Sequence, residues 1–262
     1  MKLTDGLYRI GAYLRHYLTA GNTLGHGIHS PKLYYIVRFL FYDNNAYYCF
    51  HDIEKERLRL LRASKMLAVD DYGTGMSGQR TIAYIADTSL APAREAQLLF
   101  RLVNHIKPAV IVELGTSLGI TTAYLAKAAP HAGIITFEGS HAIAEEAKKV
   151  WQNLKVNNTT LICGNIDDAL PLQLKDIEKV DFALIDANHT EEATLRYFGL
   201  LLSKCHENSI IVIDDIHNSI EMNRAWNKCR KNPQVTSSFD LYGMGMLFLD
   251  KQLLPKHYTL RI

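Results

Sequence analysis

The chain has 262 residues, of which 48% are hydrophobic and 21% are charged, and its formal net charge is +2 at pH 7. These are ordinary values for a globular protein, and the small charge gives no strong electrostatic attraction to nucleic acid. No apolar run approaches the roughly 20 residues that cross a bilayer, so we expect no membrane segment. The length fits one large domain, or one standard domain with an appendage.

The first 18 residues have the pattern of an amphipathic helix, with Arg and Asp among apolar residues. They lack the short apolar core and the small-residue cleavage site of a signal peptide, so a cytoplasmic protein is expected. The cysteines form no C-x-x-C pair, which argues against a disulfide framework or a cysteine zinc site. They are Cys49, Cys163, Cys205 and Cys229.

The pattern of the chain changes near Pro92. Before this residue, aromatic-rich segments with helical spacing alternate with loops. They cover residues 7–18, 26–43 and 53–67. Residues 1–91 are therefore predicted to form a mainly helical N-terminal extension, with a role as a lid or an interface.

After Pro92, short apolar runs alternate with amphipathic helices, which predicts a parallel sheet covered on both faces. The runs are residues 109–114, 133–138, 159–163, 180–186 and 209–214, and the helices include residues 120–129, 141–154 and 190–204. Two further runs, 234–242 and 245–250, are joined by a short glycine-containing link that is typical of an antiparallel hairpin. Residues 92–262 are predicted to be an α/β domain: a doubly wound, mostly parallel, seven-stranded Rossmann-like sheet with this hairpin at its edge.

Two glycine loops compete for the role of nucleotide loop. Residues 70–80 place Gly73, Gly75 and Gly78 in the literal G-x-G-x-x-G spacing. A dinucleotide loop also needs a strand before it, a helix after it and an acid at the end of the next strand. Residues 70–80 meet these conditions poorly, and we interpret them as a glycine turn between the extension and the sheet.

The second loop, "VELGTSLGITT", fits the structural context better. An apolar strand leads into Glu113 and Gly115, a helix is predicted to begin near Thr121, and Glu138 ends the next strand. The loop lacks the middle glycine that lets the backbone approach a pyrophosphate. A nucleoside ligand without phosphates would not need that glycine.

The stretch "VELGTSLGITTAYLA" resembles motif I of the class I S-adenosylmethionine-dependent methyltransferases. The resemblance implies that Glu138 accepts both ribose hydroxyls and that "CGNIDDALP" lines the adenine. Asn165 and Asp167 have an alternative interpretation as caps of the next helix. The cofactor-binding residues implied are Glu113, Gly115, Thr116, Ser117, Gly119, Glu138, Gly139, Asn165, Ile166, Asp167 and Asp186.

Three carboxylates, Asp186, Asp214 and Asp215, fall at the carboxyl ends of two successive predicted strands. Ligands of open α/β sheets bind in the crevice outside those ends. Three converging acids repel one another unless a cation is present, and Mg²⁺ prefers such oxygen ligands. In the alternative without metal, Asp186 lies near the amine of the methyl donor, and the other two acids cap the following helix.

This arrangement resembles the metal-dependent O-methyltransferases that have an Asp-x-x-His motif and paired aspartates. The resemblance implies that His189 is the general base and that Asp186, Asp214 and Asp215 are magnesium ligands, with His189 and Asp186 as catalytic residues. His189 has an alternative interpretation as a local helix N-terminal residue. His217 follows within one turn, and we interpret it as structural.

The sequence thus predicts an S-adenosylmethionine-dependent methyltransferase that methylates a small hydroxylated acceptor, with Mg²⁺ and a histidine base. Two alternatives stay open: a nicotinamide-dependent oxidoreductase that uses residues 70–80, and a non-catalytic interaction protein that retains the nucleotide fold. The expected partner is the small-molecule acceptor, and a homodimer is also considered.

Overall fold

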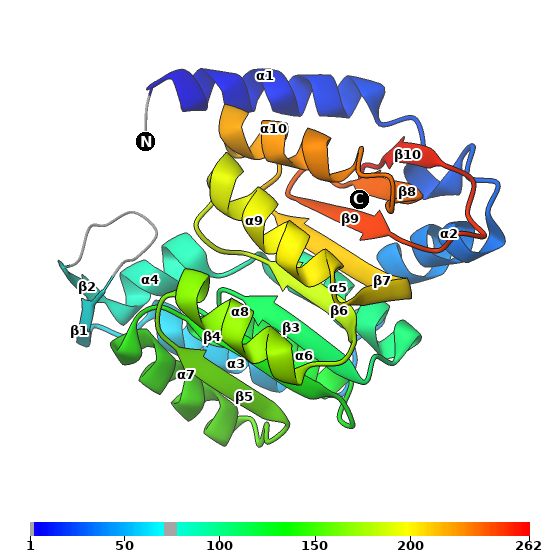
Figure 1. The fold of residues 1–262 in the computed structure, drawn as a ribbon. Coiled ribbons are helices and arrows are strands. Elements are labelled where there is room, and N and C mark those ends of the chain that lie inside the picture. The colour runs from blue at the N-terminus through cyan, green and yellow to red at the C-terminus, as the bar shows by residue number, and fades with distance from the viewer. Residues whose placement is uncertain (1–2, 71–77) are drawn as a thin grey trace. The chain divides into compact units, whose positions relative to one another are not determined.

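The computed structural model describes residues 3–70 and 78–262. Figure 1 shows the course of the chain as a ribbon. The contacts within it divide the chain into two units. The continuous unit is residues Asn44–Ile177, and the discontinuous unit joins Met1–Asp43 to Glu178–Ile262. Each unit is described by itself.

The continuous unit contains three parallel strands in the order β3-β4-β5. Their Val, Ile and Leu side chains and the helices that join them follow the predicted alternation, so the α/β prediction is confirmed here. The strands are β3 (Val110–Leu114), β4 (Gly133–Glu138) and β5 (Thr159–Cys163), and the helices are α5 (Ala93–Ile106), α6 (Ile120–Ala128), α7 (His141–Asn153) and α8 (Ile166–Asp176).

The same unit begins with a helix, an antiparallel strand pair and a second helix. These elements are α3 (Phe50–Leu61), β1 (Met66–Val69), β2 (Gly78–Thr81) and α4 (Ile82–Ser89). Gly73 and Gly75 lie outside the described residues, but Gly78 begins a strand. A dinucleotide loop needs a helix to begin after its glycines. The strand that begins at Gly78 therefore does not favour the oxidoreductase alternative.

The discontinuous unit contains five strands in the order β10-β8-β9-β7-β6. They are β6 (Val180–Ile185), β7 (Cys205–Asp214), β8 (Ser237–Asp240), β9 (Met244–Phe248) and β10 (Lys256–Thr259). β6 and β7 are parallel, and β8 and β9 form the predicted antiparallel hairpin.

The predicted strand number needs correction, because β10 pairs with β8 in parallel and covers the side that was expected to be the edge. Over the described residues the strands of the large sheet therefore number eight rather than seven. β10 reads "KHYT", with one buried residue, Tyr258. Its pairing rests on the backbone, so its sequence lacks the apolar run by which the other strands were recognised.

The helices of the discontinuous unit come from both of its segments. They are α1 (Leu3–Thr19), η1 (Thr23–Gly25), α2 (Pro31–Tyr35), η2 (Ile36–Phe41), α9 (Glu191–Leu202) and α10 (Ile220–Cys229). α2 begins where Ser30 Oγ accepts a hydrogen bond from Leu33 N and Pro31 occupies the first turn. The helical character predicted for the N-terminal region is confirmed. Its boundary near residue 92, as the limit of an independently folding domain, stays a prediction.

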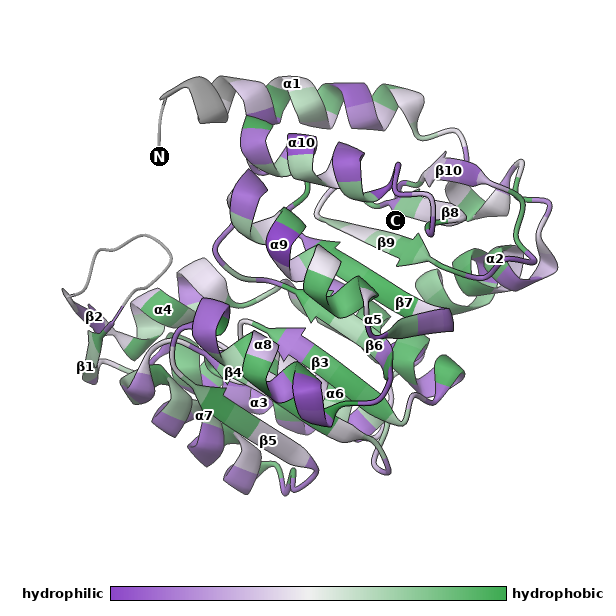
Figure 2. Cartoon of the chain, in the orientation of Figure 1, coloured by the Kyte–Doolittle hydropathy of each residue, from purple (hydrophilic) through white to green (hydrophobic). Residues whose placement is uncertain are grey.

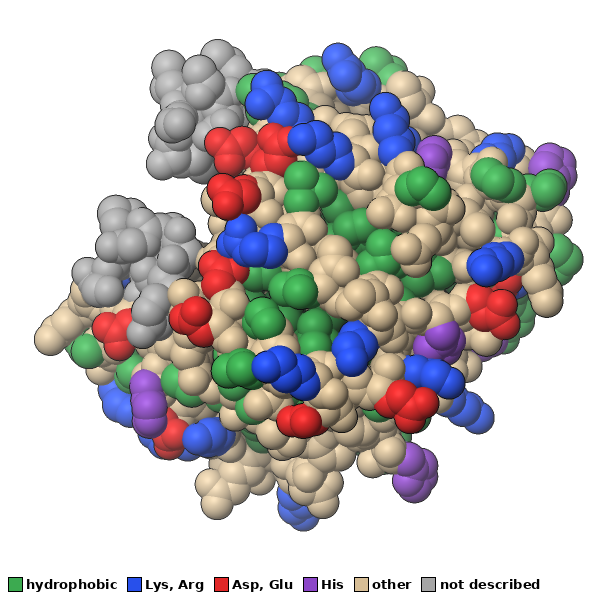
Figure 3. Space-filling view, viewed as in Figure 1, with side chains coloured by type: hydrophobic (Ala, Val, Ile, Leu, Met, Phe, Trp, Pro, Cys, Tyr) green, Lys and Arg blue, Asp and Glu red, His purple; other side chains and the backbone are tan. Residues whose placement is uncertain are grey.

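Hydrophobic residues concentrate on strands such as β7, while the helices carry both hydrophobic and hydrophilic residues (Figure 2). In the discontinuous unit, Gly245 of β9 lies under the Trp226 ring, and a Cβ there would be 2.5 Å from it. Acidic and basic side chains are interspersed on the face shown in Figure 3. No helix among the described residues is long and apolar enough to cross a membrane.

Candidate functional site

The loop between β3 and α6 turns sharply at the end of its strand. Gly115, Ser117 and Gly119 have φ values of 99°, 47° and 77°, in the left-handed region that glycine adopts most readily. The backbone N–H groups of Gly115 and Thr116 donate to the carbonyl of Phe137 at 3.1 and 2.9 Å. The loop predicted to hold the cofactor is thereby fixed against the end of β4.

Glu138, the last residue of β4, completes this junction. Its Oε2 accepts a hydrogen bond from Ser117 N, and its Oε1 accepts one from Ser140 N, both at 2.9 Å. Glu138 is half-buried. The structure thus brings two predicted cofactor residues, Ser117 and Glu138, into contact.

Glu113 lies beneath the loop and is fully buried. Its Oε2 accepts hydrogen bonds from Thr122 Oγ1 and Thr136 Oγ1, while Oε1 has no hydrogen-bond partner among the described residues. Burial raises the pKa of this carboxyl to about 7, with the two threonines acting in the opposite direction and the nearby charge of Glu138 adding to the rise. The side chain therefore ties the end of β3 to α6 and β4.

Gly119 has a packing reason of its own. The indole Nε1–H of Trp151 donates to the Gly119 carbonyl at 2.9 Å, and a Cβ on Gly119 would lie 2.6 Å from that nitrogen. The second glycine of the motif is therefore required by Trp151, whether or not a ligand is bound.

Ser117 has a further partner that the sequence did not indicate, because its Oγ lies 2.7 Å from Ser89 Oγ at the end of α4.

The segment after β5 begins α8. Asn165 Oδ1 accepts a hydrogen bond from Asp167 N at 3.0 Å, so Asn165 is the N-cap of α8, as the capping interpretation had it. Ile166 is buried and Asp167 lies in the first turn. Gly139 stands in the short turn between β4 and α7.

In the discontinuous unit, His189 lies between two of the predicted acids. Its Nε2 is 3.6 Å from Asp186 Oδ1, and its Nδ1 is 3.8 Å from Asp215 Oδ2. All three side chains are partly exposed. Asn188, His189 and Asp215 have φ values of 62°, 39° and 57°, and such strained backbone in non-glycine residues is often found at functional sites.

Other residues cap the helices that follow these acids. Thr190 Oγ1 accepts from Ala193 N at the start of α9, and Ser219 Oγ accepts from Met222 N at the start of α10. The alternative in which Asp214 and Asp215 cap the next helix is therefore wrong.

The predicted magnesium ligands Asp186, Asp214 and Asp215 suit a hard cation by their donor type. Their carboxylate oxygens lie farther apart than the ligand atoms of a preformed metal site. Across residues 3–70 and 78–262, the one set of three ligand atoms within 4.8 Å of one another belongs to His16, His217 and Asp240. The three aspartates do not form such a set, and His189 lies between two of them.

Known proteins are similar to part of this chain. Residues 112–216 match the family described as a methyltransferase domain. Over 128 residues the chain is 30% identical to a probable O-methyltransferase of Mycobacterium tuberculosis. This match covers 45% of the chain and 54% of that relative, so it spans about half of the relative's length.

Solved structures share the fold. The O-methyltransferase TomG from Streptomyces achromogenes, in complex with SAM, has a TM-score of 0.55 and 20% identity, covering 62% of this chain and 82% of that one. An O-methyltransferase from Bacillus cereus in complex with SAH has a TM-score of 0.58 and 16% identity, covering 78% and 92%. The chain therefore shares the fold of these solved O-methyltransferases, and its residues 112–216 are similar to a methyltransferase domain. These three relatives are described as O-methyltransferases.

Proposed function

We propose that this protein is an S-adenosylmethionine-dependent O-methyltransferase that acts on a small hydroxylated acceptor. The observation that carries the proposal is the junction of the β3–α6 loop with Glu138, where a carboxylate at the end of β4 is held by the backbone N–H groups of Ser117 and Ser140 beside a tightly turned loop. A vicinal ribose diol has the complementary donors. The methyltransferase-domain match over residues 112–216 supports the same function.

The chain's residues divide the binding task. We assign the turn at Gly115, Thr116 and Ser117 to the methionine part of the cofactor, Glu138 to its ribose, and the segment from Asn165 to Asp167 to its adenine. Glu113 would hold the end of β3 against α6 and β4, and Gly119 would let the loop pack against Trp151. When bound, S-adenosylmethionine supplies a sulfonium methyl group that is already activated for in-line displacement.

The acceptor hydroxyl is a poor nucleophile until it loses its proton. We assign His189 to accept that proton, with Asp186 and Asp215 on either side to orient the ring and stabilise its charged form. Asp186, Asp214 and Asp215 would hold Mg²⁺. When bound, the ion lowers the pKa of the acceptor hydroxyl.

Calorimetric titration with S-adenosylmethionine and S-adenosylhomocysteine tests the cofactor assignment. Glu138→Gln should weaken binding by about 10- to 100-fold, because hydrogen bonds to a charged group contribute about 1.5–3 kcal/mol. Glu145→Gln, on the exposed face of α7, is the matched control. Thermal melts of both variants are needed, since Glu138 also holds two backbone N–H groups. No binding by the wild type up to millimolar cofactor would refute the proposal.

Turnover of His189→Ala tests the base. Loss of a general base lowers the rate by about 10²- to 10⁴-fold, while cofactor affinity should be retained. His206→Ala is the matched control, because His206 also pairs with an aspartate, Asp181 at 2.8 Å, away from these acids. A rate equal to the wild type would remove His189 from this role. The same assay with and without chelator tests the magnesium assignment.

The remaining alternatives give different results in these assays. Tight cofactor binding without methyl transfer over a broad acceptor panel would favour the non-catalytic interaction protein. Nicotinamide dinucleotide binding in place of S-adenosylmethionine would favour the oxidoreductase. Light scattering of the purified chain tests the homodimer.

A further inference from the structure

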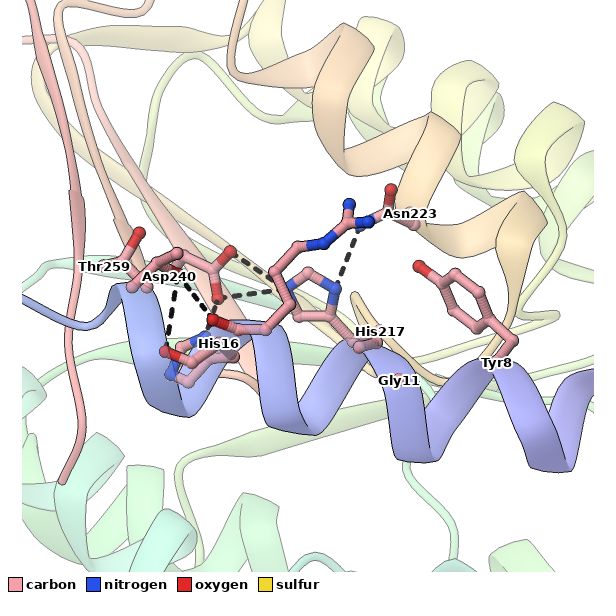
Figure 4. A pocket seen from close by; sticks show the side chains of 10 residues that line it. Tyr8, Gly11, His16, His217, Asn223, Asp240 and Thr259 are labelled. Carbon is pink, nitrogen blue, oxygen red and sulfur yellow. Dashed lines mark hydrogen bonds and ion pairs between the residues drawn. The ribbon is translucent and has the colours of Figure 1, made fainter.

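A pocket of about 310 Å³ lies in the discontinuous unit, between α1, the start of α10 and the ends of β8 and β10 (Figure 4). Tyr8, Arg15 and Asn223 line it together with two histidines and an aspartate. None of these residues has a part in the proposed methyl transfer. The inference drawn from them does not rest on the proposed function.

His16, His217 and Asp240 meet in one wall of this pocket. His217 Nε2 is 2.9 Å from Asp240 Oδ2 and 3.1 Å from Oδ1, and His16 Nδ1 is 3.2 Å from Asp240 Oδ1. The exposed fractions of the three side chains are 6% for His16, 13% for His217 and 19% for Asp240. One ligand atom from each residue lies within 4.8 Å of the other two.

The hydrogen bonding of His16 points to a cation. Its Nε2 lies 3.0 Å from the Leu260 carbonyl, which only accepts, so Nε2 carries a proton. In the neutral ring, Nδ1 is then a lone pair directed at a carboxylate oxygen, and this nitrogen has no hydrogen bond within the described part of the chain. Two acceptors that face each other in a buried site need a positive charge between them.

The rings are also held in place. Tyr242 stacks on His217 at 5.4 Å with an interplanar angle of 18°, and it meets His16 edge-on at 5.6 Å. Its backbone N–H donates to Asp240 Oδ1 at 3.1 Å. A carbonyl on the far nitrogen of a histidine and a backbone N–H on the carboxylate are the outer partners that orient metal ligands.

We propose that His16 Nδ1, His217 Nε2 and Asp240 bind a divalent transition metal of the zinc type, with an open coordination position that faces the pocket. Two imidazoles and one carboxylate are a ligand set of zinc sites that keep a fourth position for water or a ligand. His16 is also the one buried residue among the described side chains of α1. The metal would therefore fasten this helix to the strands.

Loading the site requires one local change. Arg230 donates to Asn227 Oδ1, Asn227 Nδ2 donates to Asn223 Oδ1, and Asn223 Nδ2 faces His217 Nδ1 at 2.9 Å. A ring that binds metal through Nε2 carries its proton on Nδ1 and needs an acceptor there. The Asn223 amide must turn over, while Asn227 Nδ2 keeps its bond to the Asn223 backbone carbonyl at 2.7 Å.

This requirement gives a gain-of-function test. Asn223→Asp places a carboxylate acceptor at His217 Nδ1 without a turn, so it should tighten zinc binding by about 10-fold, within the range measured for such outer partners. The competing structure is metal-free, with His16 doubly protonated and paired to Asp240. If this metal-free structure is the native one, Asn223→Asp should not bind zinc more tightly than the wild type.

The experiment uses the full chain, stripped with chelator, and Zn²⁺ in competition with a chromophoric chelator. We expect one tight site per chain, a visible d–d spectrum when Co²⁺ replaces Zn²⁺, and slower amide hydrogen exchange in α1 when metal is added. His16→Gln and Asp240→Asn should each weaken binding by more than about 100-fold. His206→Gln, in the two-residue pair with Asp181, is the matched control and should bind like the wild type.

Asp215→Asn separates this site from the acids at the ends of β6 and β7. Zinc binding that is lost in Asp215→Asn but kept in His16→Gln would overturn the proposal. So would wild-type affinity in Asn223→Asp, or no tight site in the wild type. Thermal melts identify variants that fail to fold. If His16→Gln and Asp240→Asn fail to fold, the zinc affinity of Asn223→Asp decides the proposal.

Discussion

Replacing Glu113 by Gln should change how the stability of the protein depends on pH. The wild-type carboxyl is fully buried with a pKa raised from 4.5 to about 7, mainly by desolvation. A raised carboxyl pKa means that the folded state binds the proton more tightly than the unfolded state. The stabilising contribution is complete below about pH 4.5 and is lost as the pH rises through about 7.

The size of the effect follows from the same values. The rise from 4.5 to about 7, at about 1.4 kcal/mol per pKa unit, corresponds to about 3 kcal/mol of unfolding free energy. Glutamine keeps an oxygen for Thr122 and Thr136 but does not titrate. The difference in unfolding free energy between the variant and the wild type should therefore shift by about 3 kcal/mol in favour of the variant between pH 4.5 and pH 8.

Urea unfolding at a series of pH values, followed by the fluorescence of Trp151 in the same unit, measures this difference. Other titrating groups contribute equally to the variant and the wild type, so they cancel in the difference in unfolding free energy. The new amide hydrogens at the Oε1 position add a cost that does not change with pH, so they do not change how this difference depends on pH. Glu207→Gln, on an exposed residue, is the control and should show a flat difference. A difference for Glu113→Gln that stays constant to within about 0.5 kcal/mol from pH 4.5 to 8 would refute the reasoning.

Three further changes test other parts of the structure. Gly119→Ala should cost about 2–4 kcal/mol, from its positive φ and the 2.6 Å approach to Trp151, in urea unfolding. Gly245→Ala, with a Cβ 2.5 Å from the Trp226 ring, should cost about 3 kcal/mol or lower the melting temperature by several degrees. Burial alone would raise the pKa of Asp240, but its interactions with His16 and His217 and a hydrogen bond from Tyr242 N–H lower it. Its contribution is present above about pH 4 and lost below, so the cost of Asp240→Asn should shrink from pH 6 to pH 3 in chelator-treated protein.

Gly133→Ala and Gly199→Ala serve as controls for the two glycine predictions, because a Cβ at either position meets nothing within 4 Å. Costs for them equal to those of Gly119→Ala and Gly245→Ala would mean that the close contacts do not decide stability. A cost of Asp240→Asn that is the same at pH 6 and pH 3 would contradict the lowered carboxyl pKa.

The strands that were predicted from the sequence are those that consist mainly of buried Val, Ile and Leu residues. β3, β4 and β6 match their expected runs to within a residue or two. β10 was missed, because four residues with one buried ring carry no periodicity. The β1–β2 pair was missed for a similar reason: each strand has four residues, and β2 reads "GQRT".

The candidate site shows the same division. Glu138 and Ser117 were recognised because the loop and the strand end have a local pattern, and their contact follows from the parallel pairing of β3 with β4. Ser89 and the trio of His16, His217 and Asp240 have no such pattern. His16 and Asp240 lie at opposite ends of the chain, and only the packing of α1 beside β8 and β10 brings them together.

The division into a continuous and a discontinuous unit bears on how the protein is made. Residues 44–177 leave the ribosome as one uninterrupted stretch, and all the elements of their unit are present once it has emerged. Residues 1–43 belong with residues 178–262, and His16 Nε2 donates to the carbonyl of Leu260. During synthesis α1 therefore lacks its packing partners until residues 178–262 have been made. Five large apolar side chains of α1 are exposed even in the native state. These are Ile10, Tyr13, Leu14, Tyr17 and Leu18. α1 is translated before the strands that hold it in place, and a nascent-chain protease assay should find α1 susceptible until β10 has been translated.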